Sequence, residues 1–189
     1  MSKIRLGFAM CGSFCTFAPV LQQLSLLCQT YDVFPILSDA AYATDTRFGA
    51  AQAQRDAITQ LCGHEILHTL AQVEPIGPKK LLDILAVVPA TGNTLAKLAH
   101  GIADTPVTLA VKAHLRNESP VVLAVSSNDA LAGNAASIGM LLARRHHYLV
   151  PMRQDAPQQK PRSVVADFAL LPQTIAAALE GRQLQPLLL

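Results

Sequence analysis

Residues 81–104 read LLDILAVVPATGNTLAKLAHGIAD, and this stretch decides the fold of the chain. Its apolar first part predicts a buried strand that ends at Val88. The apolar residues that follow recur at helical spacing and predict a helix; they are Leu95, Leu98, Ala99 and Ile102. Thr91 or Asn93 would cap this helix, and Gly101 would end it. In open α/β sheets, ligand sites commonly form where polar residues lie between the end of a strand and the N-terminus of the following helix.

The rest of the chain continues the alternation of strand and helix. Further strands are predicted over residues 4–10, 33–37 and 121–125, with a last one over 148–150. Helices are predicted over residues 15–29, 47–61, 94–100, 129–142 and 172–179, with one more that Asp104 would cap, and a polar loop over 154–163. This order predicts an α/β fold, a doubly wound, mostly parallel sheet with helices on both faces, as in Rossmann-like or flavodoxin-like three-layer sandwiches. We expect residues 1–189 to form one domain.

Composition narrows the class of protein. Hydrophobic residues make up 51% of the chain and charged residues 15%, so we expect some apolar surface to be buried between subunits of a homo-oligomer. No apolar run approaches the roughly 20 residues of a membrane span, and the N-terminal residues do not resemble a signal peptide. A net charge of +2 without a basic block argues against nucleic acid as a partner. We therefore expect a cytoplasmic protein whose four cysteines are reduced.

Small polar residues follow four of the predicted strands: Gly12-Ser13, Ser38, Thr91 to Thr94, and Ser126 to Asn128. Because parallel strands end at one edge of a sheet, we expect these residues to line one crevice. Glycine beside a helix N-terminus suits a phosphate group. The sequence is neither GxGxxG nor a Walker motif, so a mononucleotide with one phosphate fits better than a dinucleotide or a nucleoside triphosphate.

Residues 89–104 also resemble the signature PAxxNTxAKxAxGIAD of the FMN-binding flavoprotein family that includes cysteine decarboxylases. This resemblance implies FMN as the cofactor. Gly12, Ser13 and Ser38 would hold the phosphate side of FMN. The residues that would border its ribityl chain and ring are Thr91, Gly92, Asn93, Thr94 and Ser126.

Other segments resemble the B subunits of dipicolinate synthases, which help to make the pyridine dicarboxylate of bacterial spores. These segments are 45–49 (DTRFG), 75–78 (PIGP), 115–117 (LRN), 127–131 (SNDAL) and 151–161, which ends in Lys160-Pro161. The resemblance covers nearly the full chain. It implies a spore-forming bacterium, a small dicarboxylate substrate, oxidation of a dihydrodipicolinate-type ring, and a partner A subunit that binds NAD(P).

Departures from the decarboxylase pattern matter for the reaction. The catalytic histidine of those enzymes corresponds, by counting back from Pro89, to Pro75. Their Met-Trp substrate motif is missing, although Asn128 is kept. Proline cannot transfer a proton, so decarboxylation is disfavoured. An FMN-dependent decarboxylase and a non-catalytic binding subunit remain as alternatives.

Cationic side chains are candidates for binding a dicarboxylate, because a guanidinium group bonds a carboxylate through two parallel hydrogen bonds. They are Arg47, Lys97, Arg116, Arg153 and Lys160. Arg47 and Lys97 lie in matched motifs and, with Asn128, are the candidate catalytic residues.

Residues 64–68 read HEILH, which matches the HExxH zinc motif. That motif needs a continuous helix, but Gly63 predicts a helix end immediately before it. No third ligand motif follows. We expect a solvated surface segment and no metal site.

Overall fold

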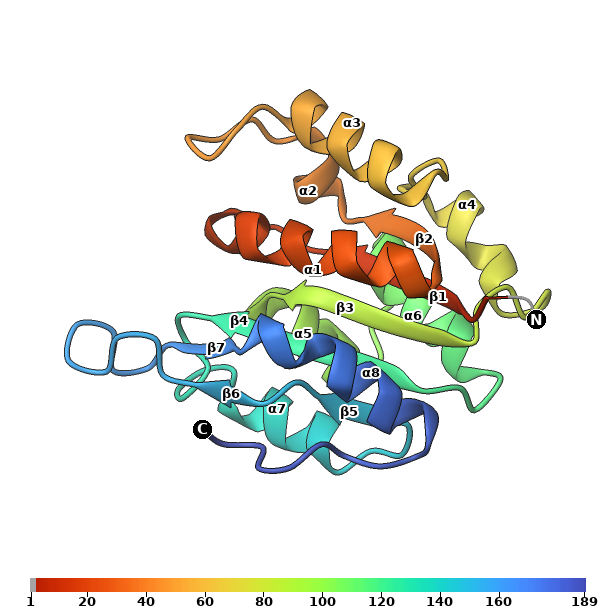
Figure 1. The fold of residues 1–189 in the computed structure, drawn as a ribbon. Coiled ribbons are helices and arrows are strands. Elements are labelled where there is room, and N and C mark those ends of the chain that lie inside the picture. Colours follow the sequence, from red (N-terminus) through yellow and green to blue (C-terminus); the bar gives the residue numbers. More distant parts are fainter. Residues whose placement is uncertain (1–2) are drawn as a thin grey trace.

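A seven-stranded sheet organises residues 3–189, the part of the chain that the computed structural model describes (Figure 1). The strands are β1 (Arg5–Met10), β2 (Asp32–Leu37), β3 (Ile84–Ala90), β4 (Val121–Ser127), β5 (His147–Leu149), β6 (Met152–Arg153) and β7 (Val164–Ala166). Their order is β2-β1-β3-β4-β7-β6, and β5 pairs with β4 beside this path. The pairs among β1 to β5 are parallel, whereas β7 is antiparallel to both β4 and β6. The predicted mostly parallel α/β sheet is confirmed.

Helices cover both faces of this sheet. They are α1 (Phe17–Thr30), α2 (Asp39–Ala43), α3 (Ala51–Cys62), α4 (Leu70–Val73), α5 (Gly92–Ala99), α6 (Pro106–Leu115), α7 (Ala135–Leu142) and α8 (Leu171–Leu179). Successive β3 side chains alternate between two cores: Leu85 and Val87 pack with α5, α6 and α7, whereas Ile84 and Ala86 pack with α1, α3 and α8. Figure 1 shows α1 and α8 in front of the strands. Among the described residues, no helix has the length and apolar character needed to cross a membrane.

The connection from β3 to α5 folds as predicted. Every residue of β3 is buried. Thr91 is the N-cap of α5, and its hydroxyl accepts a hydrogen bond from the Thr94 backbone N–H. Gly101 has a φ of +72°, and its N–H donates to the Leu98 carbonyl while Ile102 N–H donates to Lys97. This left-handed glycine ends the helix and satisfies its last carbonyls.

The sequence predictions were wrong about three helix starts. Asp104 does not cap α6, because Thr105 and Thr108 form a reciprocal capping box there and Asp104 pairs with Lys97 instead. The helix predicted from residue 129 begins at Ala135, since residues 129–134 form hydrogen-bonded turns. The helix predicted from residue 47 begins at Ala51. Before it, Thr46 and Gly49 exchange backbone hydrogen bonds in a tight turn, with Gly49 at a φ of +142°.

Residues 148–150 are not the last strand, contrary to the prediction, because β6 and β7 follow as an antiparallel pair. These two strands have only two and three residues, too few to show an alternating pattern in the sequence. The segment between them is the predicted polar loop, residues 154–163. β7 pairs Val164 and Val165 with the last residues of β4, so this loop projects from the end of β4 (Figure 1).

Candidate functional site

A cavity of about 700 Å³ opens at the carboxyl ends of β1, β3 and β4. This volume is typical of small-molecule sites, which span roughly 300–1,000 Å³. The predicted site residues on its wall are Gly12, Ser13, Arg47, Thr91, Gly92, Asn93, Ser126 and Asn128. Lys160, a candidate for binding the dicarboxylate, and Ser127, expected in the crevice, also line it. The wall further includes residues that sequence reasoning did not select, among them Phe14, Cys15, Thr16, Phe48, Asn134, Asp155 and Ser163.

A second cavity of about 430 Å³ lies beside the first. Both are lined by Gly12, Thr91 and Asn93, so the β1 and β3 ends form their common wall. Ser38, Thr94 and Lys97 line the second cavity only. The four polar strand ends therefore gather around two adjoining cavities, and the predicted residues divide between them.

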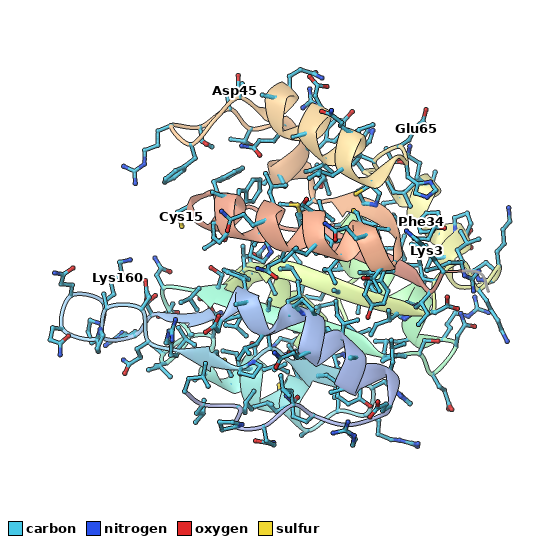
Figure 2. All side chains as sticks on the ribbon, in the orientation of Figure 1. Lys3, Cys15, Phe34, Asp45, Glu65 and Lys160 are labelled. Atoms are coloured by element: carbon cyan, nitrogen blue, oxygen red, sulfur yellow. The ribbon has the colours of Figure 1, made fainter. Side chains whose placement is uncertain are left out.

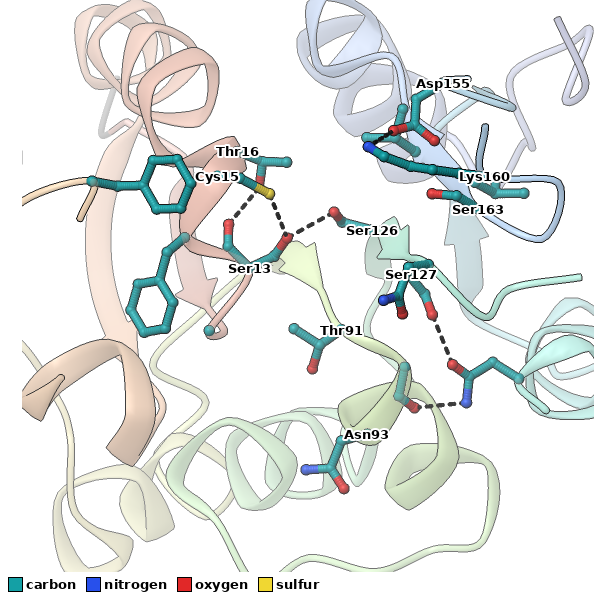
Figure 3. A pocket seen from close by; sticks show the side chains of 18 of the residues that line it. Ser13, Cys15, Thr16, Thr91, Asn93, Ser126, Ser127, Asp155, Lys160 and Ser163 are labelled. Atoms are coloured by element: carbon teal, nitrogen blue, oxygen red, sulfur yellow. Dashed lines mark hydrogen bonds and ion pairs between the residues drawn. The ribbon is translucent and has the colours of Figure 1, made fainter. Parts of the chain in front are cut away.

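Hydroxyl groups connect the strand ends of the larger cavity. Ser13 Oγ lies 2.9 Å from Ser126 Oγ, which joins the β1 and β4 ends across β3 (Figure 3). The Ser13 carbonyl accepts hydrogen bonds from the backbone N–H and the hydroxyl of Thr16. Each serine hydroxyl has one donor and two acceptor positions, so both keep capacity for a bound ligand.

A buried polar chain supports the wall between the cavities. Thr91 Oγ1 lies 3.1 Å from Thr94 Oγ1, and the Thr94 hydroxyl donates to Cys11 Sγ at 3.2 Å. Burial raises the pKa of the Cys11 thiol to about 11. A thiol with this pKa is neutral at pH 7 and is a poor nucleophile. Cys11 therefore has a packing role.

Gly92 lies where the α5 N-terminus meets the turn before α7. A Cβ atom at this position would be 1.8 Å from Asn134 Oδ1 and 2.9 Å from Ser127 Oγ. The Ser127 hydroxyl donates to Asn134 Oδ1 at 2.8 Å, and Asn134 Nδ2 donates to the Gly92 carbonyl (Figure 3). Only glycine permits this close approach. Sequence reasoning did not select Asn134 as a site residue, because it lies inside the helix that was predicted over 129–142.

Ser38 and Lys97 already have partners in the smaller cavity. Ser38 Oγ accepts a hydrogen bond from the Ala41 N–H and so caps α2. Lys97 Nζ lies 2.8 and 2.9 Å from the two carboxylate oxygens of Asp104. The Lys97 ammonium lowers the pKa of Asp104, so this ion pair is complete at neutral pH.

The cationic candidates are distributed unevenly. Arg47 and Lys160 line the larger cavity and Lys97 the smaller one. Arg47 comes from the turn before α3, where its guanidinium group lies 4.8 Å from the centre of the Phe48 ring. Arg116, at the end of α6, and Arg153, in β6, line neither cavity.

The HExxH segment is extended, not helical. Gly63 ends α3 with a φ of +69°, as predicted. Leu67 then exchanges backbone hydrogen bonds of 2.9 Å with Pro35 and Leu37 of β2. Figure 2 shows Glu65 far from Cys15 and Lys160, which mark the cavity end of the molecule.

The two histidines of this segment have separate structural partners. His64 Nε2 lies 2.7 Å from Asp32 Oδ1, and its ring stacks on Phe34. The His68 ring stacks on Tyr42. Within residues 3–189, no group of three or more His, Cys, Asp or Glu side chains is placed to hold a metal ion. The helical geometry that the zinc motif requires is therefore not present here.

Pro75 lies in a short 3₁₀ helix, Glu74–Ile76, that precedes β3. The cavities are at the carboxyl end of the same strand, and Pro75 lines neither of them. Within one chain, position 75 is therefore not part of either cavity.

Comparison with known proteins agrees with this geometry. A family profile described as Flavoprotein matches residues 1–140. The dipicolinate synthase B subunit of Bacillus subtilis (strain 168) is 41% identical over 185 residues, covering 97% of this chain and 92% of that protein. The crystal structure of the dipicolinate synthase B subunit from Bacillus halodurans has a TM-score of 0.91 at 40% identity, covering 100% of this chain and 98% of that one. An FMN-dependent cysteine decarboxylase, SpaF, shares the fold with a TM-score of 0.68 at 23% identity, over 95% and 97% of the two chains.

Proposed function

Because this chain belongs to the flavoprotein family, we propose that it binds FMN and acts as the flavoprotein subunit of a dipicolinate synthase. The observation that carries this proposal is the similarity to two dipicolinate synthase B subunits over almost the whole chain. That similarity extends beyond the strand ends into the 154–163 loop, which borders the larger cavity. The decarboxylase alternative has support from the fold alone.

The donor groups and dimensions of the two cavities fit FMN. Many hydroxyl and amide groups line the walls, and Lys97 supplies a positive charge in the smaller cavity. Gly12 lines both cavities, and a Cβ atom there would be 3.3 Å from the Ala40 Cβ, so the close packing of α2 favours glycine at this position. We place the phosphate in the smaller cavity near Gly12, Ser38 and Thr94, and the ring in the larger one near Ser13 and Ser126. Ser13 was expected on the phosphate side; because it lines only the larger cavity, we assign it to the ring side in this proposal.

Bound FMN would supply a ring that can accept a hydride from a substrate or pass one on. The residues of this chain would bind and orient the substrate beside it. Arg47 can pair with one substrate carboxylate through its planar donors, and Asn128 can hydrogen-bond the same molecule from the end of β4. Lys97 is separated from this position and paired with Asp104, so we assign it to the phosphate side. NAD(P) would bind to the partner A subunit, because no phosphate fingerprint of a nicotinamide site is present in this sequence.

The test is formation of dipicolinate, followed by its ultraviolet absorbance, with each of the two subunits alone and with both together in the presence of NAD(P). We expect turnover only with both subunits. Arg47→Ala should lower kcat/KM by tenfold or more, since it removes a charge-assisted carboxylate contact, while Arg116→Ala, outside both cavities, should not. Full turnover by this chain alone would contradict the two-subunit proposal. Equal activity of the two arginine variants would remove Arg47 from the site.

A further inference from the structure

The 154–163 loop is a fixed part of the cavity wall. Inside it, Lys160 N–H donates to the Ala156 carbonyl at 2.6 Å and Ser163 N–H donates to the Lys160 carbonyl at 3.0 Å. The Arg162 carbonyl accepts from Leu131 N–H at 3.0 Å, which ties the loop to the segment after β4. These bonds hold the base of the loop beside Ser126 and direct Lys160 and Asp155 toward the cavity (Figure 3).

Three charged side chains line the larger cavity: Arg47, Lys160 and Asp155. Arg47 comes from the turn before α3, whereas the other two come from the 154–163 loop. Figure 1 shows these two segments projecting from the same end of the sheet, on either side of it. The cavity therefore has one cation on each of two separate walls. A flat dicarboxylate has two anionic groups, and each needs a cation or several donors when it leaves water.

Lys160 already holds a carboxylate. Its Nζ lies 3.0 Å from Asp155 Oδ2, and the side chains are 57% and 30% exposed. The Ser163 hydroxyl, then the Lys160 ammonium, lower the pKa of Asp155, and Asp155 in turn raises the pKa of Lys160. Both groups are therefore charged at neutral pH. Partly exposed ion pairs contribute little to stability, so another carboxylate can replace Asp155 at low cost.

We propose that Lys160 binds the second carboxylate of the dicarboxylate substrate, and that Asp155 occupies this ammonium group until the substrate displaces it. The proposal rests on the proposed function, because the ligand is the substrate of that reaction. Asp155 makes the site selective. A monocarboxylate bound at Arg47 leaves the Lys160–Asp155 pair intact, whereas a dicarboxylate gains a second contact without a further loss of rigid-body freedom.

The experiment measures dissociation constants of pyridine-2,6-dicarboxylate and pyridine-2-carboxylate for the FMN-saturated complex of both subunits. Lys160→Met should weaken dicarboxylate binding tenfold or more and leave the monocarboxylate within twofold. Asp155→Asn should tighten dicarboxylate binding several-fold by removing the competing charge, and this gain should vanish in the Lys160→Met background. Lys79→Met, at an exposed lysine outside both cavities, is the matched control and should bind as the unmodified chain does.

A kinetic experiment distinguishes failure of the Lys160 proposal from failure of the proposed function. In the two-subunit assay, Lys160→Met should raise KM for the dihydro substrate and keep kcat within a few-fold. If the unmodified complex forms dipicolinate while Lys160→Met keeps its KM and its affinity for the dicarboxylate, the role of Lys160 is overturned and the proposed function stands. Weaker dicarboxylate binding by Asp155→Asn would also overturn it. If the unmodified complex neither binds the dicarboxylate nor forms it, both proposals fail.

Discussion

Ser13 connects two of the strand ends that line the larger cavity. Its hydroxyl contacts Ser126 across the end of β3, and its neighbour Gly12 lines both cavities. A side chain at position 13 therefore lies beside any ligand that extends from one cavity into the other. A carboxylate there would lose its water when a ligand binds, and it would break the serine pair.

We expect FMN to bind with micromolar affinity and Ser13→Asp to abolish binding, because its carboxylate would lose water beside the uncharged flavin ring without a paired cation. Ser13→Ala should retain FMN within about tenfold, since it removes one neutral hydrogen bond of about 1 kcal/mol. Quenching of flavin fluorescence during titration of the apo protein measures both. Ser119→Asp adds the same charge just before β4, at the opposite end of that strand, and is the control. Tight binding by Ser13→Asp would show that the ligand does not pass this residue.

Local rules identified some of these residues, and tertiary contacts determined the others. Thr91 and Gly101 could be predicted because capping depends on neighbours within a few residues of the chain. Asn134 contacts Gly92, 42 residues away, so no local pattern could identify that contact. Lys160 was a candidate by its charge and sequence resemblance, but its pairing with Asp155 inside the cavity depends on how the loop folds. The binding roles of the predicted cofactor residues remain predictions.

At the scale of elements, the site depends on how closely α5 approaches the turn before α7. Gly92 makes this approach possible, and Asn134 spans the gap with hydrogen bonds to both sides. Both elements contribute to the wall of the larger cavity. A change in their separation should therefore alter stability and ligand binding together.

We expect Gly92→Ala to destabilise the protein by about 1–3 kcal/mol, because its Cβ would overlap Asn134 and force the turn away. Gly139→Ala is the matched control within α7, where a Cβ meets no atom within 4 Å. It should stabilise by about 0.5–1 kcal/mol, since alanine loses less backbone entropy in a helix. Urea unfolding measures both changes, and FMN titration of the folded variants should show loss of affinity for Gly92→Ala only. A stability change of the same sign in both variants would contradict this account.

Periodicity identified the longer elements and failed for the short ones. β1, β3 and β4 consist mainly of apolar residues, and they were predicted within three residues at each end. β6 and β7 exist because backbone groups of β4 and β7 pair across about 40 residues of chain, which no short window can show. The predicted first residues of three helices were wrong for a related reason. Hydroxyl caps such as Thr105 and turns such as 129–134 compete with helix propensity.

At the scale of the whole molecule, apolar residues exceed what the two cores bury. Ile102, Met140 and Leu142 are 47%, 40% and 41% exposed, on and just after the adjacent helices α5 and α7. Solvent-exposed side chains of this size are common singly, but several on neighbouring helices are typical of subunit interfaces.

We expect a homo-oligomer at micromolar concentration, with or without FMN, in sedimentation velocity experiments. Met140→Lys should shift the distribution toward monomer, because a charge in an apolar interface has no partner there. Leu26→Lys is the control, since this residue is 52% exposed on α1, part of the opposite layer. A monomer in every condition would refute the expectation. An equal shift in both variants would place the interface elsewhere.

The antiparallel pair β6 and β7 has a consequence for how such proteins can diversify. A helical crossover between parallel strands must span the whole layer, whereas the 154–163 loop only joins two neighbouring strand ends at the margin of the sheet. Doubling the length of such a loop costs about 0.6 kcal/mol in closure entropy. The 154–163 loop can therefore change in length or charge while the polar residues at the strand ends keep their sequence. With the proposed roles of Lys160 and of the strand-end residues, substrate preference and cofactor binding depend on separate segments of one chain, and selection can act on either alone.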